Sequence, residues 1–287
     1  MSNEIKIIDL GKLSKPATVL IEKVSSAIGI AYEPTRIRRK AQAQIDAEKI
    51  KALGRLEIGA LEQRALERLV FQEARKQENI EQITAQAADM LPEDAKVADL
   101  NEDWVAHFFK QCDTVSDKEM QSLWSRLLSG EAAKPGTFSK RTVDFVSSID
   151  KRDAEIFTNL SKFVWVVGGP QPLIYDLNHQ LYKQHGVTFD TMKHLDAIGL
   201  VSFESLSGYM VTKLPKKVMT VYYGMPLIIE FPNEQDNTIQ TGHVLLTATG
   251  RELVSICGSS SSDEFFQYML GKWIAEGLIL STPVKEI

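Results

Sequence analysis

The first hydrophobic pattern in the chain is a short amphipathic stretch near its beginning. Ser14 is of a type that caps helix N-termini, and Pro16 fits a first turn. The apolar residues that follow recur at helical spacing. They are Val19, Leu20, Val24, Ala27 and Ile28. The pattern predicts an amphipathic helix from Ser14 to about Ile30, within an N-terminal segment of residues 1–33.

A much longer helical pattern follows, from about Thr35 to Met90. Ala, Gln, Glu, Lys, Arg, Leu and Ile dominate it, and no proline occurs between Pro34 and Pro92. An unbroken helix of this length would reach on the order of 80 Å. Gly54 and Gly59 each weaken a helix by roughly 1 kcal/mol, which predicts a bend or break near them. Residues 34–91 are therefore predicted to form a long charged helix or helical hairpin.

One face of this segment is apolar and is the candidate surface for self-association. Residues spaced by three and four positions lie on the same side of a helix. The candidates are Leu53, Leu56, Ile58, Leu61 and Leu69, with Ala60 and Ala65 on the same face. The spacing is not a strict heptad. We expect the helix to project, to fold back, or to pair with copies of itself.

Core-facing apolar residues mark a helical domain over residues 92–168. A helix is expected from Asn101, with Trp104, Val105, Phe108 and Phe109 facing inward. The capping box Ser116 to Glu119 predicts the start of the next helix, and Gly130 its end. Two further helices are expected, over residues 139–149 and 151–166, before Gly168-Gly169-Pro170 stops the helical part.

The pattern changes character over residues 169–287. Helices are expected over 172–185 and 189–198, followed by a hairpin of strands 200–204 and 209–213. That order outlines a winged helix. Further elements are strands 218–223 and 227–231, a strand running into a helix over 244–253, a helix over 263–275 and a strand over 278–280.

The predicted fold class is mainly α. It combines a long N-terminal helix and a helical bundle with a small α+β, winged-helix-like C-terminal domain. A chain of 287 residues has room for two folded parts and a helical arm.

Composition places the chain among ordinary soluble proteins. Hydrophobic residues make up 44% and charged residues 25% of it, and its formal net charge is -5. That charge gives no global attraction to nucleic acid or to anionic lipid. Neither a secretory signal nor a membrane-spanning helix is expected, so we expect a cytoplasmic protein, with peripheral contact at the inner membrane as the alternative.

The search for chemical motifs indicates no enzyme class. Phosphate-binding loops, dinucleotide fingerprints, zinc helices and nucleophile elbows are absent from the sequence. The five histidines are scattered, and Cys112 and Cys257 lie far apart without metal-ligand spacing. No catalytic residue, metal ligand or cofactor is therefore indicated, although catalytic groups can converge from distant positions without a motif.

Two local features support alternative functions. A winged helix suggests DNA binding. The helix expected to enter the major groove, however, carries Lys193 and His194 beside Asp190 and Asp196, a mixture of charges that suits DNA poorly. The wing would add Lys213, Lys216 and Lys217. The N-terminal amphipathic helix precedes a basic cluster, which gives candidates for anion or membrane contact. These candidates are Arg36, Arg38, Arg39 and Lys40.

Several sequence blocks resemble a bacterial family known only as a domain of unknown function. They are residues 37–43 (IRRKAQA), 119–124 (EMQSLW), 128–131 (LSGE), 135–141 (PGTFSKR) and 194–200 (HLDAIGL). The resemblance implies no catalytic residues. It implies a bacterial setting, in which small proteins of this kind are often encoded in mobile or defence-related regions, and from this we expect a role in resistance to phage. The composition of the long helix is also similar to the helical arms of prohibitin-type scaffold proteins.

The leading hypothesis is a non-enzymatic protein that self-associates through the long helix and contacts a protein partner of unknown identity. A winged-helix DNA-binding regulator and a membrane-active effector using the N-terminal helix are the alternatives.

Overall fold

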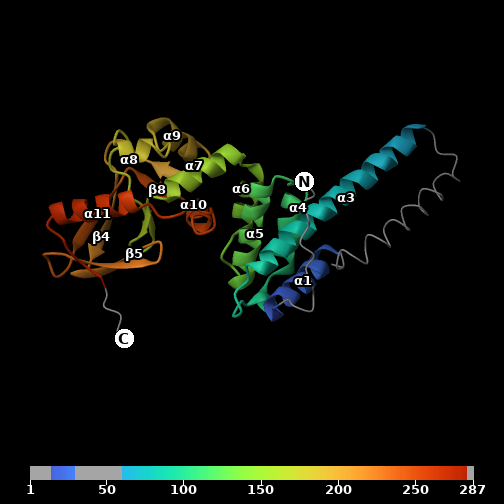
Figure 1. Ribbon diagram of the computed structural model, residues 1–287, viewed down its shortest axis with the longest axis horizontal. Coiled ribbons are helices and arrows are strands. Elements are labelled where there is room, and N and C mark those ends of the chain that lie inside the picture. Colours follow the sequence, from blue (N-terminus) through green and yellow to red (C-terminus); the bar gives the residue numbers. More distant parts are fainter. Residues whose placement is uncertain (1–13, 30–59, 283–287) are drawn as a thin grey trace. The chain divides into compact units, whose positions relative to one another are not determined.

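The computed structural model describes residues 14–29 and 60–282 (Figure 1). The chain divides into two compact units, Met1–Ser147 and Ser148–Ile287. The fold is mixed α+β and mainly α, as the hydrophobic pattern predicts.

The first unit is helical throughout its described part. Its elements are α1 (Lys15–Ile28), α3 (Ala60–Asp89), the 3-10 helix η2 (Val97–Asp99), α4 (Glu102–Cys112), α5 (Lys118–Ala133) and α6 (Lys140–Ser148). The predicted amphipathic helix is confirmed as α1. The Ser14 side chain accepts a hydrogen bond from the Ala17 amide, and Gly29 ends the helix in the left-handed conformation.

Helix α3 lies inside the predicted long helical segment. It begins at Ala60 and its buried residues lie between Asn79 and Ala88, where it packs against α5. The rest of the predicted long helix, including the expected break near Gly54 and Gly59, lies outside the described residues.

Aromatic side chains of α4 and α5 make the core of this unit. Phe108 stacks on Trp104 and meets Phe109 and Trp124 edge to face, with ring centroids 5.0–5.2 Å apart. All four rings are buried. This confirms the inward-facing set predicted from the spacing along α4.

Both predicted boundaries of α5 are wrong in detail. Asp117 caps the helix, because its carboxylate accepts from the amides of Glu119 and Met120. Ser116 instead contacts Arg75 and Asn79 on α3. The helix also continues past Gly130 to Ala133. Gly130 is a point of close approach, since a Cβ there would lie 2.7 Å from the Phe138 ring.

The second unit mixes short helices with three sheets. Its helices are α7 (Lys151–Ser161), α8 (Gln180–Lys183), α9 (Phe189–Ala197), α10 (Ala248–Leu253) and α11 (Asp263–Ala275). Its strands are β1 (Val164–Val166), β2 (Pro170–Pro172), β3 (Val201–Phe203), β4 (Tyr209–Leu214), β5 (Lys217–Tyr222), β6 (Met225–Glu230), β7 (Asn237–Gly242), β8 (Val244–Leu246) and β9 (Ile279–Ser281).

The largest sheet has the strand order β2-β1-β5-β6-β9, with every neighbouring pair antiparallel. Helix α11 packs on one face of this sheet. There Trp165 of β1 meets Trp273 and Phe266 of α11, at centroid distances of 4.8 and 5.6 Å. The predicted pair of strands over 218–231 is confirmed as β5 and β6, and the predicted last helix as α11.

Two predicted helices in this region are wrong in extent. The helix expected over 151–166 ends at Ser161, because residues 164–166 pair as β1 with β2 around Gly168. The helix expected over 172–185 is reduced to the four residues of α8. Ahead of α8, Asp176 accepts from the Asn178 amide, a local turn that competes with helix.

The predicted hairpin over 200–213 is also wrong. Its two strands exist as β3 and β4, but β3 pairs with β8 and β4 pairs with β7. Strand β7 (NTIQTG) was not predicted, because its polar composition resembles a loop. Gly242 at its end adopts φ +89°, and a Cβ there would collide with the Ile174 carbonyl oxygen.

Candidate interaction surface

The N-terminal half of α3 is the most exposed apolar surface among the described helices of the first unit. In Figure 1 the Ala60 end of α3 extends beyond α1, α4 and α5. Leu61 is 72% exposed and Leu69 53% exposed, and Val70 and Phe71 are each more than half exposed. Large exposed apolar groups gathered on one element are typical of a binding surface.

Most of these side chains share one side of the helix. Successive residues are rotated by about 100°, so Leu61, Ala65, Leu66, Leu69 and Val70 fall within about half of the circumference. We call this set the α3 stripe. Phe71 lies on the opposite side. By the same rotation, Glu62 and Glu73 lie on this side of the helix at the two ends of the stripe, so its apolar part is the stretch of residues 65–70 between them.

The structure brings together only part of the predicted self-association set. Leu61 and Leu69 lie on the α3 stripe, while Leu53, Leu56 and Ile58 lie outside the described residues. The sequence prediction missed Leu66 and Val70, which flank the row of Leu61, Ala65 and Leu69. Leu66 directly follows Ala65, and Val70 directly follows Leu69. This second pair of apolar residues, also four positions apart, was the signal in the sequence that could have identified them.

The apolar face of α1 is used inside the first unit. Leu20, Ile21 and Val24 are buried where α1 packs on α3 and α4. The basic cluster Arg36, Arg38, Arg39 and Lys40 lies outside the described residues. None of the helices in residues 14–29 and 60–282 is long and apolar enough to cross a membrane.

Most of the basic residues considered for DNA contact are engaged within the second unit. Lys193 lies 3.7 Å from Asp196 and over the Phe203 ring, and His194 lies 2.6 Å from Asp153. Two of the lysines that the sequence assigned to the wing also pair with acids, at Lys216–Glu234 (2.7 Å) and Lys217–Glu230 (3.1 Å). These contacts reduce the positive charge available to a phosphate backbone.

A cavity of about 400 Å³, lined by both polar and apolar side chains, opens between the chain before α8 and the start of α9. Its lining residues include Tyr175, Asp176, Asn178, Phe189 and His243. Burial is the main cause that raises the pKa of Tyr175, whose hydroxyl donates to the Gln240 carbonyl. A phenol with a raised pKa stays protonated near neutral pH, so Tyr175 is no ready nucleophile.

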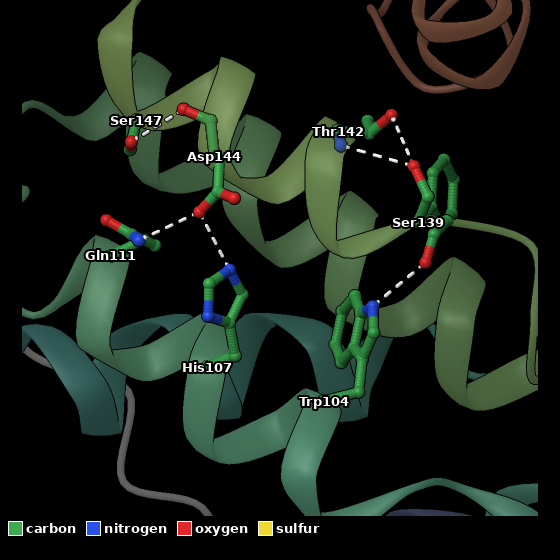
Figure 2. Close-up of polar contacts among 8 residues, drawn as sticks. Trp104, His107, Gln111, Ser139, Thr142, Asp144 and Ser147 are labelled. Atoms are coloured by element: carbon green, nitrogen blue, oxygen red, sulfur yellow. Dashed lines mark hydrogen bonds and ion pairs between the residues drawn. The ribbon is translucent and has the colours of Figure 1, made fainter.

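A second polar cluster joins α4 to α6 in the first unit (Figure 2). One oxygen of Asp144 lies 2.7 Å from His107 Nε2 and accepts from the Gln111 side chain at 2.9 Å. Beside it, the Trp104 indole donates to the Phe138 carbonyl at 2.8 Å. The carboxylate side chain is about half exposed, and the cluster connects two helices, which fits a structural role.

A metal site is the last kind of site to consider in the described part of the chain. Within it, no three His, Cys, Asp or Glu side chains gather in a way that could hold a metal ion. The α3 stripe therefore remains the strongest functional feature built from the described residues.

Comparison with known proteins identifies the family and no activity. The family model for proteins of unknown function called DUF2806 matches residues 63–270. This range contains the blocks 119–124, 128–131, 135–141 and 194–200, but not the block 37–43. No curated protein and no solved structure matches the chain. Because the family model covers well over half of its length, the chain belongs to the DUF2806 family of proteins of unknown function.

Proposed function

We propose that this protein is a non-enzymatic self-associating protein that assembles through the α3 stripe. The observation that carries the proposal is the exposure of Leu61 and Leu69 at the projecting end of α3. Leaving two leucines in water forfeits roughly 1.5–3 kcal/mol each relative to full burial. A second copy of the helix would recover part of that free energy.

Helical pairing suits the shape of this surface. The stripe spans more than two helical turns and occupies one side of a single helix, so a second helix can pack along it. The opposite side carries Arg64, Glu67 and Arg68, which keep it hydrated. An isologous contact, in which both copies use the same residues, is the simplest arrangement.

The test measures the solution mass of the full chain by light scattering. The parent protein should be a multimer, and a variant with Leu61→Glu and Leu69→Glu should have a smaller mass at the same concentration. Phe71→Glu is the matched control, because it makes the same kind of change on the opposite side of α3. A monomeric parent protein, or an unchanged mass for the double variant, would refute the proposal.

Truncation is a poor substitute for these point variants. Removing residues 1–90 would also remove α1 and the buried residues of α3, including Leu20, Val24 and Ile83. The remaining helices would lose part of their core, so loss of assembly could reflect unfolding.

For the finer fold of the second unit, we infer a winged-helix-like arrangement. The order α7, α8, α9, followed by the strand pairs β3–β8 and β4–β7, is consistent with it, with the hairpin β5–β6 inserted between β4 and β7. Ile174 supports this arrangement, because it forms a parallel β-bridge with Gly242 at the end of β7 and so adds a third strand position there. The salt bridges of Lys193, Lys216 and Lys217 favour a protein-binding use of this module over DNA binding.

A salt titration tests the DNA-binding alternative. Protein-binding use predicts no duplex binding at physiological salt. Affinity for duplex DNA that falls steeply with salt, and falls further in Lys193→Ala and Lys216→Ala variants, would favour a DNA-binding regulator instead.

A further inference from the structure

The second unit leaves one face of its largest sheet uncovered over β5, β6, β9 and the Val166 end of β1. Directly opposed residues of antiparallel strands point to the same face, so the pairing register sorts the side chains. Val166 faces Val221, Val221 faces Pro226, Met219 faces Ile228, and Glu230 faces Ile279. We call the set Val166, Met219, Val221, Pro226, Ile228 and Ile279 the open sheet face.

Exposure separates this face from the one that α11 covers. Met219 is 66% and Ile279 65% exposed, whereas Thr220, Tyr222, Leu227 and Ile229 on the other face are buried. A run of apolar side chains across four adjacent strands, with Val166, Met219, Pro226 and Ile279 exposed, is typical of an interaction surface.

The charges on the open sheet face indicate what it binds. The charged side chains next to it on the same side of the sheet are Lys217 and Glu230, which face each other across β5 and β6 with Nζ and Oε2 3.1 Å apart. One cation and one anion make the face neutral, so it offers no attraction to a strongly acidic or basic partner. A twofold axis parallel to the strands and midway between β5 and β6 would place Lys217 of each copy near Glu230 of the other, because these two residues are directly paired across the strands.

The sheet edges are consistent with face-to-face contact. Strand β2 carries Pro170 and Pro172, which lack amide donors and close that edge to a further strand. Strand β9 is only three residues long. Sheets that pack face to face interdigitate their side chains into a common core, which suits Met219, Ile228 and Val166.

We propose that the open sheet face binds the same face of a second copy of this chain, forming a twofold sheet-to-sheet contact. This contact is independent of the α3 stripe. A chain with two separate self-association surfaces forms assemblies larger than a dimer, closed or extended according to symmetry.

The test uses the full chain carrying Leu69→Glu, so that the α3 stripe does not contribute to assembly. This protein should remain a dimer by sedimentation velocity, and adding Met219→Glu should raise its dissociation constant at least about tenfold, because the glutamate would be buried unpaired. Thr212→Glu on the exposed side of β4 is the matched control and should leave the mass unchanged. A Leu69→Glu protein that is already monomeric, or an unchanged mass after Met219→Glu, would overturn the proposal.

A charge-swap pair distinguishes a second copy from any other occupant. In the same background, Lys217→Glu and Glu230→Lys should each yield monomers, and an equimolar mixture of the two should form a dimer. Failure of the mixture to pair would overturn the twofold contact. If Leu69→Glu leaves the parent mass unchanged, the α3 proposal fails, while the Met219 and charge-swap results still decide this one.

Discussion

Asp153 Oδ1 lies 2.6 Å from His194 Nε2, and this contact joins the first turn of α7 to α9. The same carboxylate accepts from the Asp150 amide through its other oxygen, so it also caps α7. Two neighbouring helices of the second unit therefore depend on one side chain.

The protonation of Asp153 should affect stability at low pH. Burial acts to raise the pKa of Asp153, but the hydrogen bonds from His194 and the Asp150 amide, with the nearby positive charges, lower it overall. A carboxyl with a lowered pKa contributes stability above its unfolded value of about 3.9, and that stability is lost as pH falls through the folded value. We expect Asp153→Asn to cost about 1 kcal/mol at pH 7 and to make the acid limb of the stability curve shallower.

Urea unfolding at a series of pH values measures this effect. Glu155→Gln, on an exposed position of the same helix, is the control and should match the parent protein. An acid limb that is equally steep in Asp153→Asn would show that the contact does not carry the pH dependence.

Gly130 supports a prediction in which two effects oppose each other. In the middle of a helix, Gly→Ala normally gains roughly 0.5–1 kcal/mol. Here the new methyl group would lie 2.7 Å from the buried Phe138 ring, and overpacking costs typically about 1–3 kcal/mol. We expect Gly130→Ala to destabilise the protein by about 1 kcal/mol.

Gly271 is the matched control for that substitution, because it lies inside α11 with nothing within 4 Å of a new Cβ. Gly271→Ala should stabilise the protein, and Phe138→Leu should relieve part of the cost of Gly130→Ala. The thermal unfolding midpoints of Gly130→Ala, Gly271→Ala and the Gly130→Ala/Phe138→Leu double variant measure the expected losses and gains of stability. A stabilising Gly130→Ala would mean that the ring moves aside freely.

Gly130 also shows what sequence patterns do and do not determine in this chain. Apolar spacing predicted α1, α4 and α11 because burial of one helix face is a local property of the sequence. The pattern could not show that Gly130 makes room for Phe138, since that contact depends on the chain returning eight residues later. Likewise, β3 and β4 were found as strands, but their partners β8 and β7 lie beyond the inserted hairpin β5–β6.

The interaction surfaces were predictable to different degrees. The row of Leu61, Ala65 and Leu69 was visible from its helical spacing, although only the structure shows that it lies on the exposed half of α3. The open sheet face was not predictable. Whether Met219 or Thr220 faces solvent depends on which face α11 covers, and alternation alone does not decide that.

Glu131 should be the most sensitive buried carboxylate of the first unit. It is 3% exposed, and its two oxygens accept from the amides of Gly136 and Phe138 at 2.7 and 2.8 Å. In Glu131→Gln one oxygen becomes an amide nitrogen, which cannot accept, so one buried N–H loses its partner. We expect a cost of about 1–3 kcal/mol in urea unfolding. Glu93→Gln, at an exposed site, is the control, and equal stabilities for the two variants would contradict the assignment.

The two cysteines should differ sharply in reactivity, because Cys112 is fully buried and Cys257 is partly exposed. Burial, with a smaller contribution from Asp113, raises the pKa of the Cys112 thiol, and the thiolate is the species that alkylating agents attack. At pH 8 the folded protein should therefore react rapidly at Cys257, while Cys112 reacts only when α4 opens. Mass spectrometry of a Cys257→Ser variant isolates the slow site, and urea should accelerate its labelling at the concentration where the first unit unfolds. Rapid labelling of Cys112 without denaturant would mean that the core of Trp104, Phe108 and Trp124 opens far more easily than its packing implies.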